Sequence, residues 1–109
     1  MRDERERLIH ILEAIERIAK YAQRGRRAFD EDELIQSWIV RHLQVIGEAA
    51  RALPSPFRDQ HPEIPWPHII GMRHILIHEY FDIDLDIVWR AVERDLPDLK
   101  RKIEAILNQ

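Results

Sequence analysis

The sequence predicts an all-α fold, an antiparallel bundle of four main helices that forms one domain over residues 1–109. Apolar residues recur at spacings of three and four in four long segments, and no segment alternates apolar and polar residues as a strand does. Prolines at 54, 56, 62, 65 and 67 predict a structured connector between the second and third segments. A chain of 109 residues builds a modest core, which a second copy would enlarge.

The first two helices are predicted on either side of Gly25. The first covers about Asp3–Arg24, and its apolar stripe comprises Leu8, Leu12, Ile15, Ala19 and Ala22, widened by Ile11 and Ile18. Asp30 is the predicted N-cap of the second helix, since acidic residues follow it in the first turn. That helix extends to about Leu53, and its apolar positions are Ile35, Ile39, Leu43, Ile46, Ala50 and Leu53.

The third helix is predicted to begin at Pro67, because proline is favoured in the first turn, and to end near Tyr80. A fourth begins near Asp84, with a stripe of Leu85, Val88, Val92, Leu99, Ile103 and Ile106. Pro97 falls inside this helix, and we expect it to kink or restart the helix there.

Composition excludes several classes of protein. The chain has 17 Lys and Arg against 20 Asp and Glu, a net charge of -3, which argues against a broad basic platform for nucleic acid but allows a local cationic site. The absence of cysteine excludes disulfides and thiolate metal sites. The N-terminal segment is charged, without an apolar signal core, and no apolar run is long enough to span a membrane. We therefore expect a cytoplasmic protein without a membrane partner.

The segment 71–80 concentrates the residues best suited to chemistry. Arg73 can hold a phosphate through its planar guanidinium, and His78 can exchange a proton near neutral pH. Tyr80 can stack on a base or donate a hydrogen bond. Together these groups suit cleavage of RNA by attack of a 2′-hydroxyl on the neighbouring phosphate. The simpler interpretation is a helix end that carries solvated polar residues.

Helix geometry constrains how Arg73 and His78 could act together. Arg73 and Tyr80 are seven residues apart and share a face of a straight helix, whereas Arg73 and His78 point about 140° apart around its axis. Either the helix ends and turns at His78, or two copies of the segment meet across a dimer. We favour the dimer, with a turn at His78 contributing.

The chain resembles the HepT-like branch of the HEPN superfamily along its whole length. Arg73-x4-His78-x-Tyr80 is similar to the Arg-x4-6-His motif of that superfamily, extended by tyrosine. Further similar segments occur in the same order, at 29–30, 45–50, 61–66 and 81–89. The sequence departs from the usual pattern at His74, where a small polar residue such as Asn is common, and at Glu79, where a small residue is common.

The resemblance implies a homodimeric helical bundle whose two motif helices form a shared cleft. It implies a metal-independent endoribonuclease, a toxin of a toxin–antitoxin pair, without a cofactor. Arg73 would bind and polarise the phosphate, and His78 would be the acid–base group. Tyr80 would lie in the cleft and receive AMP from a minimal nucleotidyltransferase antitoxin.

Other interpretations remain open beside this one. His74 and His78 lie one helical turn apart, and with Glu79 and a distant His61 or His68 they could form a metal site, although no third ligand is specified by spacing. The carboxylates at 82, 84 and 86 imitate a calcium loop, but the required glycine is Ile87, so we expect a turn and an N-cap.

Two functional questions also stay open at this point. Glu48 could orient a cleft Arg or His, with His74 also supporting the site, or Glu48 could simply be a charge on a helix surface. The alternative function is a non-catalytic helical partner of a nucleotidyltransferase, which the acidic net charge, His74 and Glu79 favour.

Overall fold

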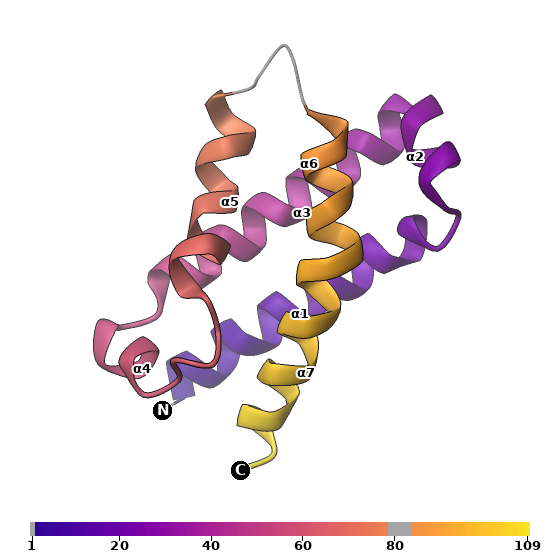
Figure 1. The fold of residues 1–109 in the computed structure, drawn as a ribbon. Helices are drawn as coiled ribbons and strands as arrows, with labels where there is room; N and C mark the ends of the chain where they lie inside the picture. Colours follow the sequence, from indigo (N-terminus) through magenta and orange to yellow (C-terminus); the bar gives the residue numbers. More distant parts are fainter. Residues whose placement is uncertain (1, 79–83) are drawn as a thin grey trace.

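The computed structural model describes the backbone of residues 2–78 and 84–109, with side chains at 3–74 and from 84 onward (Figure 1). Within these residues the chain forms helices joined by turns and contains no strand, which confirms the predicted all-α class. None of the helices in the described ranges combines the length and apolar character that crossing a membrane requires.

Helices α1 (Arg2–Ala22) and α3 (Glu33–Ala52) form an antiparallel pair. The indole N–H of Trp38, near the start of α3, donates a 2.8 Å hydrogen bond to the carbonyl of Arg17, near the end of α1. The rings of Trp38 and Tyr21 also contact each other at a steep angle, with centroids 5.5 Å apart. At the opposite end of the pair, Arg7 and Ala52 line one groove.

The buried faces of these two helices largely follow the predicted stripes. The apolar positions predicted for the second helix, from Ile35 on α3 to Leu53 at its C-terminal cap, are all buried. On α1 the stripe is rotated, because Ile11 and Ile18 are the more deeply buried residues while Ala19 is exposed. The prediction that Ala19 belongs to the buried stripe was wrong, since Ala19 borders an open, mainly apolar groove between α1 and the C-terminal helices.

A short helix, α2 (Arg26–Glu31), joins α1 to α3, and it corrects the predicted N-cap. Gly25 has a φ of 95°, a conformation that favours glycine, and turns the chain out of α1. The fully buried Phe29 anchors α2, so Asp30 lies inside a helix and pairs with Arg26. Asp32 is the N-cap of α3, and its carboxylate accepts hydrogen bonds of 2.9 and 3.4 Å from two first-turn amides.

The segment between α3 and α5 contains a single turn of helix, α4 (Ser55–Asp59). Phe57, Ile64 and Trp66 are buried and attach this segment to the core. The Trp66 indole N–H donates to the carbonyls of Arg58 and His61 at 3.1 and 3.0 Å. These bonds hold the segment against the start of α5.

Helix α5 (Trp66–His78) packs on α3, and the C-terminal helices cross α1 (Figure 1). The C-terminal part comprises α6 (Leu85–Arg90), the π-helix η1 (Ala91–Asp95) and α7 (Leu96–Leu107). The Asp84 side chain caps α6 as predicted, accepting bonds of 3.0 and 3.2 Å from the amides of Asp86 and Ile87. His68 of α5 contacts Asp95 of η1 at 2.9 Å and links the two parts.

The interruption expected at Pro97 takes the form of the π-helical turn that precedes it. Proline has no amide hydrogen, and its ring would collide with the carbonyl four residues earlier, which is that of Glu93. The wider η1 turn removes this conflict: the amide of Leu96 donates to the carbonyl of Ala91, five residues back. The chain then continues as α7 with Leu99 and Ile103 still facing the core.

Candidate functional site

Two adjacent helices, α3 and α5, bring together the best-placed predicted site residues. Arg73 lies on the side of α5 that faces α3, and its side chain is 24% exposed. Its guanidinium Nε forms an ion pair with the carboxylate of Glu48, which extends from α3 and is 53% exposed. The structure therefore places Glu48 beside Arg73. The sequence alone had left open whether Glu48 contacts a site residue or is a charge on a helix surface.

Gly47 is the reason that α3 and α5 can approach closely at this point. A Cβ atom on Gly47 would lie 3.0 Å from the Cβ of Arg73, 3.2 Å from its amide nitrogen and 3.4 Å from the carbonyl oxygen of Ile69. Distances of this kind leave no room for a larger residue unless the helices move apart. Gly47 thus sets the position of the Arg73 backbone relative to Glu48.

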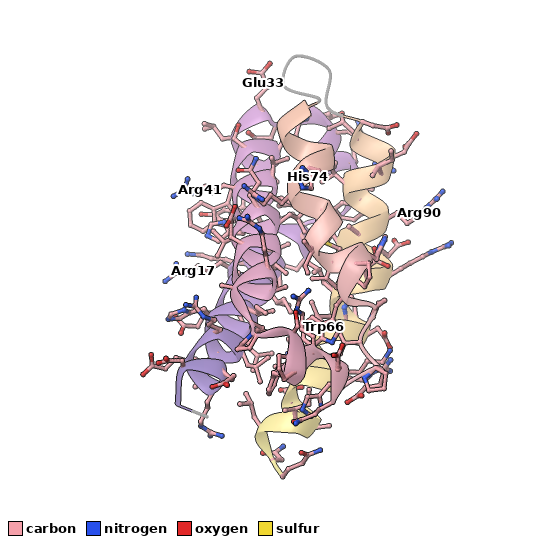
Figure 2. The ribbon with its side chains drawn as sticks, turned by 90° about the vertical axis from the view of Figure 1, so that its left-hand side faces the viewer. Arg17, Glu33, Arg41, Trp66, His74 and Arg90 are labelled. Carbon is pink, nitrogen blue, oxygen red and sulfur yellow. The ribbon has the colours of Figure 1, made fainter. Side chains whose placement is uncertain are left out.

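The structure describes the remaining predicted site residues only in part. His74 is exposed on α5 and is labelled in Figure 2, and it is not among the residues that line the groove beside Arg73. His78 is the last residue of α5, and its side chain is not among those that the structure describes. Tyr80 and Glu79 lie outside the described residues.

An open groove of about 580 Å³ borders Arg73. Its cationic and imidazole side chains come from three helices: Arg7 and His10 from α1, Arg41 from α3 and Arg73 from α5. Glu48 is the acidic residue among those that line it. The rest of the lining comprises Gln44, Val45, Ala49 and Ala52.

Sequence reasoning missed Arg7, His10 and Arg41 as part of this site. The spacing of Arg41, Gln44, Val45 and Glu48 does place them on one side of a helix. No spacing within either helix indicates that this side of α3 lies beside Arg7. That neighbourhood exists only once the helices pack.

A second groove, of about 460 Å³, lies between α1 and the C-terminal helices. Its lining is mainly apolar, with Ile15, Trp89, Val92 and Leu96 contributing. Of the predicted site residues whose side chains the structure describes, none borders it. The groove at Arg73 is therefore the one whose chemistry matches the predicted site.

Several side chains suggested as ligands of a metal or calcium site contact residues outside those sets. His61 contacts Glu63 at 3.4 Å, and His68 contacts Asp95 at 2.9 Å. Asp86 pairs with Arg26 at 2.6 Å. Among the side chains described, at 3–74 and 84–109, no three His, Asp or Glu residues are grouped so that they could hold a metal ion.

The family model for ribonuclease HepT-like proteins matches residues 11–106. The chain belongs to the HepT-like ribonuclease family. The match begins near the middle of α1 and ends in the last turn of α7, so Arg73 and Glu48 lie within it, whereas Arg7 and His10 of the groove precede it. The resemblance inferred from the residues is confirmed.

Two curated relatives match the HepT-like chain along nearly their full lengths. Probable ribonuclease HepT of Thermococcus cleftensis is 38% identical over 108 residues, covering 96% of each chain. "Putative RNase MJ1380" of Methanocaldococcus jannaschii is 34% identical over 106 residues, covering 96% of this chain and 97% of the relative.

A third relative is a longer protein. "Gamma-glutamylcyclotransferase and putative RNase MJ0434" of Methanocaldococcus jannaschii is 39% identical over 103 residues, which is 94% of this chain and 46% of the relative. The HepT-like chain thus spans about half the length of that protein. No solved structure matches the chain.

Proposed function

We propose that this chain is a metal-independent endoribonuclease in which Arg73 and His78 carry the reaction. The observation that carries the proposal is the position of Arg73, which lies at the α3–α5 contact beside Glu48 and opens onto a groove with further cations. Membership of the HepT-like family supports RNA as the substrate. The reaction needs no cofactor.

In the proposed reaction a 2′-hydroxyl oxygen attacks the adjacent phosphorus atom and the bond from phosphorus to the 5′-oxygen breaks. His78, as the acid–base group, accepts the proton of the 2′-hydroxyl and then gives a proton to the leaving 5′-oxygen. Arg73 stabilises the negative charge that grows on the phosphoryl oxygens. The products are a 2′,3′-cyclic phosphate and a 5′-hydroxyl.

We propose further that the working unit is a homodimer with a shared cleft. Helix α5 is continuous from Trp66 to His78, so backbone positions 73 and 78 lie about 140° apart around its axis and about 7.5 Å apart along it. A second α5 facing the first would supply His78 to the Arg73 of its partner. A species of monomer mass in sedimentation at micromolar concentration would contradict this arrangement.

The biological role we propose is that of a cytoplasmic toxin in a toxin–antitoxin pair. Its antitoxin would be a minimal nucleotidyltransferase that joins AMP from ATP to the hydroxyl of Tyr80 and releases pyrophosphate. AMP at Tyr80 would add a negative charge and a bulky group seven residues beyond Arg73 in the sequence. Both effects would hinder binding of RNA.

A non-catalytic role as a helical partner of the nucleotidyltransferase is the second candidate. One observation favours it: the carboxylate of Glu48 already forms an ion pair with the guanidinium of Arg73, the group that would hold a phosphate in the proposed reaction. In that case the chain would bind the nucleotidyltransferase without cleaving RNA.

Cleavage of single-stranded RNA in excess chelator separates the two candidates. We expect the wild-type chain to cut the RNA, and His78→Ala to lose at least about a hundredfold in rate, the usual contribution of an acid–base group. His68→Ala is the matched control, because His68 lies on the same helix but contacts Asp95. Equal cleavage by His78→Ala, or none by wild type, would refute the proposed reaction.

A further inference from the structure

The groove beside Arg73 extends well beyond the reach of one phosphate. Arg41 and Glu48 lie seven residues apart on α3, which is about 10 Å along the helix axis. Arg7 and His10 border the same groove from α1. Cationic and imidazole groups therefore occur along a path that starts at Arg73 and continues over α3 and α1.

The charge of this groove contrasts with that of the whole chain. The chain has a net charge of -3, yet the groove combines three arginines and a histidine with one carboxylate, and that carboxylate pairs with Arg73. Within the described residues, no ion pair involves Arg7 or Arg41. Elsewhere Arg26 and Arg101 are held by neighbouring aspartates at 2.6 to 2.8 Å.

We propose that this groove binds the sugar–phosphate backbone of the RNA at nucleotides outside the cleaved bond, with Arg7 and Arg41 contacting phosphates. This inference rests on the proposed ribonuclease function. RNA fits better than an acidic protein segment because the groove is continuous with Arg73, so its ligand carries one phosphate to Arg73 and further phosphates along the same strand. His10 can donate an additional hydrogen bond to the backbone.

Arg7 and Arg41 lie away from the reacting atoms, so they stabilise the bound substrate and the transition state equally. Such contacts lower KM and leave kcat unchanged. They also act only on RNA long enough to occupy the groove. A dinucleotide, which reaches only Arg73 and His78, would not use them.

Binding of a single-stranded 2′-O-methyl RNA oligonucleotide, measured by fluorescence anisotropy over a range of salt, tests the groove directly. This probe lacks the attacking hydroxyl, so it is not cleaved and reports binding alone. We expect Arg7→Ala and Arg41→Ala each to raise Kd about fivefold and to reduce the slope of log affinity against log salt by about 0.7. Arg41→Lys should recover most of the affinity.

Arg90→Ala is the matched control. Arg90 is exposed like Arg41 but projects from the opposite side of the molecule (Figure 2), and its Kd and salt slope should equal those of wild type. Unchanged Kd and slope in both groove variants would overturn the inference. So would a polyglutamate peptide that binds as tightly as the RNA with the same dependence on Arg7 and Arg41.

Cleavage assays on the same proteins distinguish failure of the groove from failure of the proposed function. If the wild-type protein cleaves RNA and Arg7→Ala and Arg41→Ala have the same KM as wild type, RNA binding by the groove is refuted and the proposed ribonuclease activity stands. If binding of the probe depends on Arg7 and Arg41 but the wild-type protein cleaves no RNA, RNA binding by the groove is supported and the proposed ribonuclease activity is refuted. A raised KM for long RNA, with unchanged rates on a dinucleotide, supports both.

Discussion

Replacing Gly47 with alanine tests the close contact that positions Arg73. In a helix interior alanine is favoured over glycine by about 1 kcal/mol, so helix propensity alone predicts a more stable protein. Against this, the new methyl group would lie 3.0 to 3.4 Å from atoms of Arg73 and Ile69. Those atoms are backbone atoms or a Cβ, so they can yield only if α5 moves as a unit.

Overpacking of this kind costs about 1 to 3 kcal/mol, which exceeds the gain in propensity. We therefore expect Gly47→Ala to lower the free energy of unfolding by about 1 kcal/mol, measured by urea denaturation. Displacement of α5 also separates Arg73 from Glu48. Since small errors in the position of a phosphate-binding group are costly, we expect kcat/KM on RNA to fall by about tenfold or more.

Gly71→Ala is the control for this experiment. Gly71 is also a helical glycine, on α5 itself, but a Cβ there would meet nothing within 4 Å. It should stabilise the protein by up to about 1 kcal/mol and leave cleavage unchanged. If Gly47→Ala also stabilises the protein and retains full activity, the close approach of α3 and α5 does not position Arg73.

Two further predictions rest on individual contacts, and a third rests on the proposed modification of Tyr80. Asp32→Ala should lower the free energy of unfolding by about 1 kcal/mol through loss of the α3 cap, whereas Asp30→Ala should cost under about 0.5 kcal/mol, as urea denaturation of both would show. Glu48→Gln should lower kcat/KM about tenfold while changing stability by less than about 1 kcal/mol, because the half-exposed carboxylate serves mainly to orient Arg73; an unchanged kcat/KM would contradict this role. Incubation with the proposed nucleotidyltransferase and ATP should raise the intact mass by one AMP, and Tyr80→Phe should abolish the increase; a persisting increase would place the modification elsewhere.

Much of the helical fold was predictable because it depends on local periodicity. The apolar stripe of α3 and the N-cap at Asp84 are as predicted. The errors arose where packing outweighs a local signal. Asp30 is as good a cap by composition as Asp32, but burial of Phe29 draws it into α2. The π-helical form of the break before Pro97 likewise depends on keeping Leu99 and Ile103 in the core.

The candidate site was predictable in part, for a similar reason. Arg73 and His78 stand in one segment, so a motif can indicate them. The partnership of Arg73 with Glu48 joins residues 25 positions apart, and their contact depends on the missing side chain of Gly47. An isolated glycine within an apolar helical stripe was the available signal, since it weakens the helix without a local benefit.

By itself the sequence determined the helical class and the family and indicated Arg73 and His78 as candidates, because these depend on the order of residues along the chain. Only the tertiary structure decided that Gly47 lets α5 approach α3, that Glu48 contacts Arg73, and that Arg7 and Arg41 border the same groove. Contacts of this second kind depend on which sides of separate helices meet. That choice is made by packing of the whole core, and no spacing within a single helix records it.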